Sequence, residues 1–425
     1  MTTFAVAYDR GAVNAAEIAL SLGVLGDLIF VGYEAGPAGP LLPLLRELGE
    51  VLFLDDGLEP VLTRLETAGT DAVVTFSDTM MPVAARIAAR LGLRFHSTSI
   101  MPQLTDKFRQ RGELRAHGVG DVRAHPIQHP GDWAAAVAAV GVPAVLKPLR
   151  GQGSRDTHLI TDPDVGARLS AELLAAPDPV PGLVLEEFLT GRPSEPFGDY
   201  VSVESVTTPR GVRHLAVTGK FPTLPPFREV GQFWPSPLTA TEEREVMELT
   251  GQALSALGVS IGVSHTEIKL TTTGPRIIEV NGRMGGHIND LARRAHGLDM
   301  VELTGRLALG AEPPDPPSRP EQVYFQYNCP APTGAFTLLE TLGVDDIRRI
   351  PGITGYRPYF EPGTTLPASV MTRPLDLISG VADDHDEMLA RLARVLDRLT
   401  FAIDTGNGRT LVTAAELGRE PIPAV

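Results

Sequence analysis

The sequence predicts a mixed α/β and α+β fold in several domains, and three observations support this prediction. Short apolar runs alternate with helical patterns over residues 1–103. A glycine-rich loop follows an apolar strand near residue 150. A hairpin-like segment near residue 270 carries acidic and basic side chains on one face. A chain of 425 residues can form about two to four domains of ordinary size.

The N-terminal region, residues 1–103, is expected to form a doubly wound parallel sheet. Its apolar runs are typical of buried strands, and the segments between them have helical periodicity. This βαβ alternation is characteristic of a doubly wound fold. The first turn, Tyr8–Gly11, lacks the G-x-G-x-x-G pattern, which argues against a dinucleotide site. The expected strands are Phe4–Ala7, Leu28–Gly32, Val51–Leu54 and Ala72–Phe76, and the clearest helix is Pro82–Leu91.

Residues 104–312 are expected to form a central domain, and residues 313–425 a small α+β domain. A proline-rich tract, Ala311–Pro320, marks the limit between them. Thr239 and Glu242 have the spacing of a capping box for a helix that ends near Gly258. Further helices are expected at Asp132–Val140 and Glu387–Leu399, and further strands at Ala144–Lys147, Leu183–Phe188 and Tyr200–Thr207.

The composition excludes several classes of protein. The net charge of −15 argues against a nucleic-acid backbone as a partner, because such a partner needs a basic surface. Cys329 is the only cysteine, so the chain can form no internal disulfide, and we expect an ordinary buried thiol. The N-terminus lacks a signal-peptide pattern, and no apolar run is long enough to span a bilayer. We therefore expect a cytoplasmic protein with small anionic ligands and no membrane partner.

The segment His265–His287 carries the strongest functional pattern. Two strand-like runs, His265–Leu270 and Arg276–Val280, flank a turn that contains Gly-Pro, which predicts a β-hairpin. Carboxylate and amide oxygens on its polar face suit Mg²⁺, and neighbouring cations suit phosphoryl transfer. The alternative is a solvated face whose charges pair with one another. Alternation places on the polar face His265, Glu267, Lys269, Glu279, Asn281 and Arg283, with Ile278 and Val280 on the opposite face.

A glycine-rich loop follows the strand that ends at Lys147. Glycines such as Gly151 and Gly153 let backbone N–H groups approach phosphate oxygens, and a lysine beside them neutralises charge. The spacing is not that of a P-loop. A glycine-rich hairpin without a ligand is the alternative. The strand that follows, Leu183–Phe188, carries two adjacent acids, of which alternation requires at most one to be buried.

Lysine is rare in this chain. Of 37 lysines and arginines only four are lysines, and each lies in a segment with other signs of nucleotide chemistry. A lysine is a compact point charge that an arginine does not replace. The same distribution can arise by chance, so it only supports the other patterns. The four lysines are Lys107, Lys147, Lys220 and Lys269.

Taken together, these segments resemble the ATP-grasp superfamily, specifically its carboxylate–amine ligase branch, which includes the L-amino acid (dipeptide) ligases. The resemblance runs from about Ala89 to Leu309, half of the chain. It implies an ATP-grasp fold between a pre-ATP-grasp domain and a C-terminal domain, with a mobile lid over residues 115–185. The motifs that carry it are TDKFRQR (105–111), VLKPLRGQGSRD (145–156), LEEFLTG (185–191), YVSVES (200–205), VTGK (217–220) and HTEIKLTTTGPRIIEVNGRMGG (265–286).

The resemblance implies roles for several residues of these motifs. It assigns catalysis to Arg283, His265 and Lys147, and metal binding (Mg²⁺ or Mn²⁺) to Glu267, Glu279 and Asn281. His265, Arg283, Gly285 and Gly286 would contact the acyl substrate, with His265 acting either as a general base or only as a contact. The residues implied to bind ATP are Lys107, Lys147, Gly151, Gly153, Ser154, Glu186, Glu187, Leu189, Glu204 and Lys220.

The implied reaction joins a small-molecule carboxylate, expected to be an amino acid, to an amine through an acyl phosphate, with release of ADP and phosphate. It would place the chain in specialised metabolism such as antibiotic biosynthesis, and dimerisation through the first domain is also implied. Gln232 departs from the family pattern, where histidine is common, which leaves the acyl substrate open. Two alternatives remain: an ATP-grasp enzyme of the biotin-carboxylase or purine-pathway type that activates bicarbonate or formate, and a nucleotide-binding module without catalysis.

Overall fold

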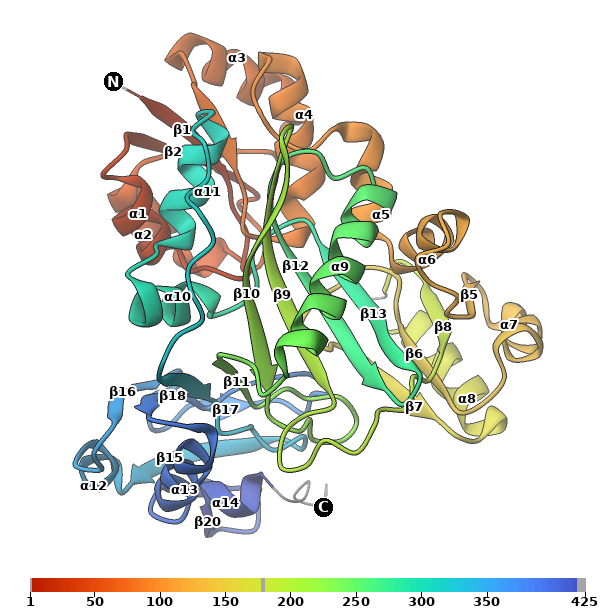
Figure 1. Ribbon diagram of the computed structural model, residues 1–425, viewed down its shortest axis with the longest axis vertical. Coiled ribbons are helices and arrows are strands. Elements are labelled where there is room, and N and C mark those ends of the chain that lie inside the picture. The colour runs from red at the N-terminus through yellow and green to blue at the C-terminus, as the bar shows by residue number, and fades with distance from the viewer. Residues whose placement is uncertain (1, 177–179, 419–425) are drawn as a thin grey trace.

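The computed structural model describes residues 2–176 and 180–418. It confirms the predicted mixture of α/β and α+β architecture in four sheets. In Figure 1 the long strands of a central sheet cross the middle of the molecule, between an N-terminal α/β unit, a small lid sheet and a C-terminal unit. No helix in the described ranges has the length and apolar character needed to cross a bilayer.

The N-terminal sheet is parallel, as predicted, with the order β3-β2-β1-β4. Its strands lie within two residues of the expected ones, because the apolar runs that predicted them fill the core on both faces of the sheet. The strands are β1 (Thr3–Ala7), β2 (Asp27–Gly32), β3 (Glu50–Phe53) and β4 (Ala72–Val74), and the helices are α1 (Ala15–Leu22), α2 (Leu42–Leu48), α3 (Leu58–Ala68) and α4 (Met81–Leu91).

The lid sheet is antiparallel and lies within the part of the chain where we expected a lid and the strand that follows it. Its apolar side packs on two helices around Trp133, Leu146 and Leu185. In order across the sheet its strands are β5 (Ala124–Ile127), β8 (Leu183–Glu187), β6 (Ala144–Pro148) and β7 (His158–Ile160), and the helices are α7 (Trp133–Val140) and α8 (Pro163–Leu174).

The central sheet has eight strands and continues across the predicted domain limit near residue 312. Helix α9 (Ala240–Ala256) begins at the predicted capping box of Thr239 and Glu242 and buries Val246 and Leu254. Figure 1 shows this helix lying across the long strands. In order the strands are β13 (Gly274–Asn281), β12 (Gly262–Thr271), β9 (Tyr200–Thr208), β10 (Gly211–Lys220), β11 (Gly231–Trp234), β14 (Val323–Tyr327), β18 (Asp376–Ala382) and β16 (Ile353–Pro358).

A second small sheet completes the C-terminal region, and Cys329 is a free, buried thiol as expected. Helix α13 (His385–Leu396) begins two residues before the expected start, because Asp384 caps it by accepting from the Glu387 backbone N–H at 2.8 Å. The other elements are β17 (Thr365–Leu366), β15 (Phe336–Leu342), β19 (Thr400–Asp404), β20 (Arg409–Thr413), α5 (Met101–Thr105), α6 (Lys107–Ala116), α10 (Ile288–His296), α11 (Met300–Ala308), α12 (Val344–Arg348) and α14 (Ala414–Leu417).

Candidate active site

The predicted hairpin is formed by β12 and β13. Glu267 lies directly opposite Glu279, and His265 directly opposite Asn281, so these four side chains share one face as alternation predicts. The prediction for Ile278 was wrong. A β-bulge shifts the register between Glu267 and Ile268, and Ile278 lines the same cavity as the two carboxylates instead of packing with Val280.

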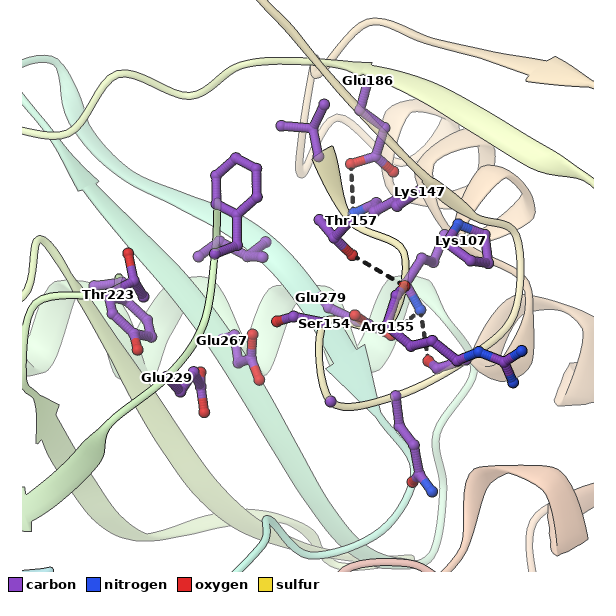
Figure 2. Close-up of a pocket in the computed structure, with 18 of the residues that line it drawn as sticks. Lys107, Lys147, Ser154, Arg155, Thr157, Glu186, Thr223, Glu229, Glu267 and Glu279 are labelled. Atoms are coloured by element: carbon purple, nitrogen blue, oxygen red, sulfur yellow. Dashed lines mark hydrogen bonds and ion pairs between the residues drawn. The ribbon is translucent and has the colours of Figure 1, made fainter. Parts of the chain in front are cut away.

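A cavity of about 240 Å³ lies between this hairpin, the lid sheet and the glycine-rich loop. Figure 2 shows Lys147 and Glu186 on one side of it, and Thr223 and Glu229 on the other. Apolar surface comes from residues such as Val145. The residues assigned from the sequence that line the cavity are Lys107, Lys147, Gly151, Gly153, Ser154, Glu186, Glu187, Leu189, Glu267, Glu279, Asn281 and Arg283.

Glu186 holds the lysine of the glycine-rich strand in place. Its Oε2 lies 2.8 Å from Lys147 Nζ and 3.0 Å from Arg111 Nη2, and its side chain is only 4% exposed. Burial by itself would raise the pKa of Glu186, but Arg111 and Lys147 outweigh it and lower that pKa to about 2. Glu186 is therefore a buried anion that orients two cations.

The Glu186 carboxylate makes stability depend on pH. Since its pKa is about 2 in the folded state against an ordinary 4.5, the stability it contributes is present above pH 4.5 and lost as the pH falls toward 2. The free energy of unfolding of the wild type, relative to Glu186→Gln, should fall by on the order of 3 kcal/mol across this window. Urea unfolding of both proteins between pH 7 and pH 3 measures the first part of the fall, about 2 kcal/mol. A difference that stays constant over this range would contradict the assignment.

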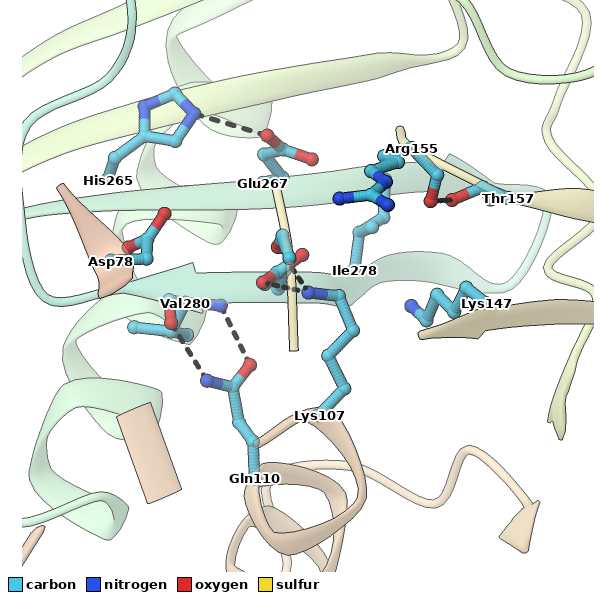
Figure 3. A network of polar contacts seen from close by, with 12 residues as sticks. Asp78, Lys107, Gln110, Lys147, Arg155, Thr157, His265, Glu267, Ile278 and Val280 are labelled. Atoms are coloured by element: carbon cyan, nitrogen blue, oxygen red, sulfur yellow. Dashed lines mark hydrogen bonds and ion pairs between the residues drawn. The ribbon is translucent and has the colours of Figure 1, made fainter. Parts of the chain in front are cut away.

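Lys107 joins helix α6 to the hairpin and to the glycine loop. Its Nζ lies 2.9 Å from Glu279 Oε1 and donates to the Gly151 carbonyl at 3.0 Å. Burial disfavours its charge, but Glu279 outweighs this and raises the pKa of Lys107. Gln110, one helical turn further on, exchanges two hydrogen bonds of 2.8 Å with the Val280 backbone (Figure 3). The helix thus holds Lys107 against the hairpin.

The donor set of the hairpin fits a divalent cation that is also bound by phosphate. The side chains of Glu267 and Glu279 are 25% and 22% exposed, and both face the cavity beside Asn281. Mg²⁺ is usually held by one or two carboxylates together with substrate phosphates and water. Across the described ranges no three histidine, cysteine or acidic side chains gather as an all-protein metal site. The set therefore matches a cation that arrives with a phosphorylated ligand.

A second polar group lies beside the cavity, connected to it through Glu267. His265 Nδ1 pairs with Glu204. Its Nε2 lies 3.3 Å from Glu267 Oε1, a contact that Figure 3 shows. Burial alone would lower the pKa of His265, but Glu204 outweighs it and raises that pKa to about 9. Glu204 Oε2 also accepts from the Gly285 N–H at 3.3 Å. Glu204, which we expected to contact ATP, is thus placed behind His265 and does not line the cavity.

Lys220 belongs to the same second group. Its Nζ donates to Gln232 Oε1 at 2.8 Å, and Gln232 Nε2 in turn donates to the Gly286 carbonyl at 2.9 Å. Lys220 and Gln232 are 4% and 6% exposed. His265, Lys220, Gly285 and Gly286 therefore lie together next to the cavity rather than in its wall. The structure separates the predicted residues into the cavity of about 240 Å³ and an adjoining polar group.

Arg283 stands between the two groups and is held from the N-terminal unit. Its Nη2 and Nε lie 2.5 Å and 3.2 Å from Asp78 Oδ2, and its Nη1 donates to the Met284 carbonyl at 2.9 Å. Burial opposes its charge, but Asp78 and then Glu279 raise the pKa of Arg283. The guanidinium is thus a permanent, oriented cation at the end of the cavity.

Several residues of the site were not predicted from the sequence. Arg111 is inside a motif, yet only the structure shows that it reaches Glu186 and the carbonyls of Ile277 and Ile278. Thr223, Phe227 and Glu229 lie within Phe221–Leu238, which resembles the family's substrate-facing segment, but the sequence assigned no individual role to them. Asp78 and Thr372 lie outside every motif that we used, and no local pattern marks them.

Known proteins that resemble this chain include ligases. No protein-family model matches the sequence. Alanine–anticapsin ligase from Bacillus subtilis (strain 168) is 27% identical over 265 residues, which cover 59% of this chain and 56% of that protein. Carnosine synthase 1 from Mus musculus is 28% identical over 275 residues, 59% of this chain and 32% of the relative. This chain thus matches little more than half the length of the first relative and about a third of the second.

The solved structures agree on the fold. The crystal structure of an L-amino acid ligase from Bacillus licheniformis superposes with a TM-score of 0.78, at 19% identity, over 94% of this chain and 98% of that one. The chain therefore shares the fold of that ligase over most of its length. The resemblance to ATP-grasp carboxylate–amine ligases that the sequence predicted is confirmed.

Proposed function

We propose that this chain is an ATP-dependent ligase that activates a carboxylate as an acyl phosphate and transfers the acyl group to an amine. The observation that carries this proposal is the position of Glu267 and Glu279. They lie opposite each other where a lysine-lined cavity meets the group around Arg283 and His265. A phosphoryl donor in the cavity and an acceptor in the second group would meet at this pair.

The cavity has the chemistry that ATP requires. Lys107 and Lys147 offer positive charge beside the loop from Gly151 to Ser154, while Val145, Leu189 and other apolar groups offer a wall for a base. Glu267, Glu279 and Asn281 would hold Mg²⁺, which when bound offsets phosphate charge as a Lewis acid. The roles proposed for Glu267, Glu279 and Asn281 depend on a metal, whereas those of the lysines, the loop and the apolar wall do not.

In the first step a carboxylate oxygen of the substrate attacks the γ-phosphorus of ATP. An O–P bond forms, the bond to the β–γ bridging oxygen breaks, and ADP leaves. The Arg283 guanidinium, fixed by Asp78, would stabilise the charge on the transferred phosphoryl group. Because Asp78 uses Nη2 and Nε and the Met284 carbonyl uses Nη1, Arg283 has one well-defined orientation.

In the second step the amine nitrogen attacks the carbonyl carbon of the acyl phosphate. The tetrahedral intermediate expels phosphate, and the proton lost by the nitrogen leaves with that phosphate. His265 has a carboxylate at each ring nitrogen, Glu204 at Nδ1 and Glu267 at Nε2, so its surroundings favour the doubly protonated ring. We therefore propose that His265 acts on the developing oxyanion through its positive charge and does not act as a general base.

The acyl substrate is proposed to be an amino acid. The names of the relatives, alanine–anticapsin ligase and L-amino acid ligase, support this class. The second polar group, together with the neighbouring Arg283, holds both signs of charge. Glu204 is acidic, whereas His265, Lys220 and Arg283 are basic. This combination suits a substrate that carries a carboxylate and an ammonium.

Phosphate release from Mg·ATP, measured against amino acids singly and in pairs with mass analysis of the products, tests the proposal. We expect ADP, phosphate and a product lighter by one water than its two parents together. ATP binding with no phosphate release in any mixture would contradict a ligase. Stimulation by bicarbonate or formate, and not by amino acids, would replace the amino acid with a one-carbon acid.

Gly285→Ala tests the second polar group by geometry. A Cβ at this position would lie 2.5 Å from His265 Nδ1, the atom that pairs with Glu204, so the imidazole must move. We expect ligation to slow by about 10- to 100-fold, since small misplacements are costly, while ATP affinity changes little. A Cβ at Gly286 would meet no atom within 4 Å, so Gly286→Ala should have a smaller effect. Equal effects of the two variants would exclude the steric explanation.

A further inference from the structure

The glycine-rich loop is attached to two distant parts of the chain. The Asp156 N–H donates to the Val370 carbonyl at 3.0 Å, and the Thr372 N–H donates to the Gly153 carbonyl at 2.9 Å. On its other side Gln152 Nε2 donates to the Arg10 carbonyl at 2.9 Å. The loop, which joins β6 to β7 of the lid sheet, therefore contacts the N-terminal unit and the C-terminal region at once.

The loop has a backbone conformation that few residues adopt without support. Ser154 and Asp156 have φ angles of 54° and 50°, in the left-handed region that most residues avoid, and Gly153 has φ 66°. Such conformations cost on the order of 1 kcal/mol each and persist where surrounding contacts fix them. The contacts with Val370 and Thr372 are of that kind.

The segment 369–373 is itself firmly attached to the C-terminal region. The Ser369 N–H donates to the Thr333 carbonyl at 2.9 Å, and the Ala331 N–H donates to the Arg373 carbonyl at 2.8 Å. The Arg373 guanidinium also donates to the Pro367 carbonyl at 2.8 Å. The loop is thus held by a part of the protein that has its own fixed structure.

Thr372 contacts two other residues that line the cavity, Gly153 and Glu229. Its N–H holds Gly153, its Oγ1 accepts from the Glu229 N–H at 3.0 Å, and both Thr372 and Glu229 line the cavity. Figure 2 shows Glu229 beside Glu267 and across from the lysines.

We propose that segment 369–373 is a latch, in which Thr372 is the positioning residue that holds the glycine loop closed over the nucleotide. Closure of the lid would then depend on the C-terminal region as well as on the nucleotide. The latch would also keep water from the acyl phosphate, and this second part rests on the function proposed above. Without the latch, ATP would still enter, but the loop would close less often.

Two variants of the full-length protein separate the contacts of Thr372. Thr372→Val keeps the shape and removes the acceptor for the Glu229 N–H, whereas Thr372→Pro removes the N–H that holds Gly153. Thr365→Val, on strand β17, is the matched control, since Thr365 Oγ1 bonds only Thr337 among the side-chain contacts of the described residues and lies outside the cavity.

The first measurement is trypsin cleavage after the exposed residues Arg150 and Arg155, with and without a non-hydrolysable Mg·ATP analogue. We expect the analogue to slow cleavage at least about 10-fold in the wild type and in Thr365→Val. Protection should drop by about 2- to 10-fold in Thr372→Val, the loss of one hydrogen bond, and be nearly absent in Thr372→Pro. Equal protection in all four proteins would overturn the latch.

The second measurement is the ratio of amide product to ADP released. Loss of the latch should lower this ratio, because more acyl phosphate is hydrolysed, while the variants remain folded by circular dichroism. If the ratio is unchanged while protection from trypsin is lost, the latch serves only to close the loop over the nucleotide. Its proposed role in excluding water would then be overturned. If no protein forms an amide, the proposed function fails, whereas the protection experiment still decides the latch, since it needs only nucleotide binding.

Discussion

Glu279→Gln is expected to reduce ligation by at least about 10³-fold, because the variant loses the charge of a proposed metal ligand where, in the proposed reaction, phosphoryl charge develops. The amide is nearly the same size as the carboxylate, so packing on the hairpin is preserved. Lys107 loses its ion-pair partner at 2.9 Å but keeps the Gly151 carbonyl. Nucleotide binding without metal should therefore persist, and titration with ATP in a chelator measures it.

The matched control for this variant is Glu340→Gln. Glu340 forms an ion pair with Arg409 on the exposed C-terminal sheet, and its side chain is 47% exposed. Exposed pairs of this kind contribute little to stability, so this variant should turn over at the wild-type rate. Ligation by Glu279→Gln within about 10-fold of the wild type would remove the metal assignment from Glu279.

Arg283→Lys should reduce ligation by about 10²- to 10³-fold although the positive charge is kept. The guanidinium reaches Asp78 Oδ2 through Nε and Nη2 and the Met284 carbonyl through Nη1. A lysine cannot reproduce this planar arrangement, so the charge would no longer have a fixed position beside the transferred phosphoryl group. Steady-state kinetics measure the loss, which should appear in kcat more than in the KM for ATP.

Arg306→Lys is the corresponding control, because Arg306 forms an exposed pair with Glu302 within helix α11. It should leave both kinetic constants unchanged. A large rise in the KM for ATP in Arg283→Lys, with kcat preserved, would contradict the assignment and make Arg283 a nucleotide-binding residue only. Near-normal kinetics would show that charge alone is sufficient at this position.

Local sequence patterns determined much of this site. The alternation of side chains in His265–Asn281 placed Glu267, Glu279 and Asn281 on one face, and the structure confirms their register. The order of apolar runs in residues 1–103 likewise predicted a parallel sheet that the structure contains. These predictions succeeded because a strand and a helix each have a fixed period, so neighbouring residues suffice to assign a face.

The bulge at Glu267 and Ile268 shows where local patterns fail. A single extra residue in one strand reverses the face of Ile278, and no residue type in the hairpin marks that position. The role of Glu204 is a similar case. Its strand was predicted, but its pairing with His265 depends on β9 lying beside β12, which is a property of the sheet as a whole.

The sequence by itself indicated which residues line the candidate site, namely two of its lysines, the paired carboxylates and the arginine that follows them. Only the tertiary structure decided what holds them. Asp78 reaches Arg283 across 205 positions of the chain, and Thr372 reaches the glycine loop from the C-terminal region. Such contacts follow from the packing of whole elements, whose energy is spread over many distant residues, and therefore leave no periodic pattern in the segments that they join.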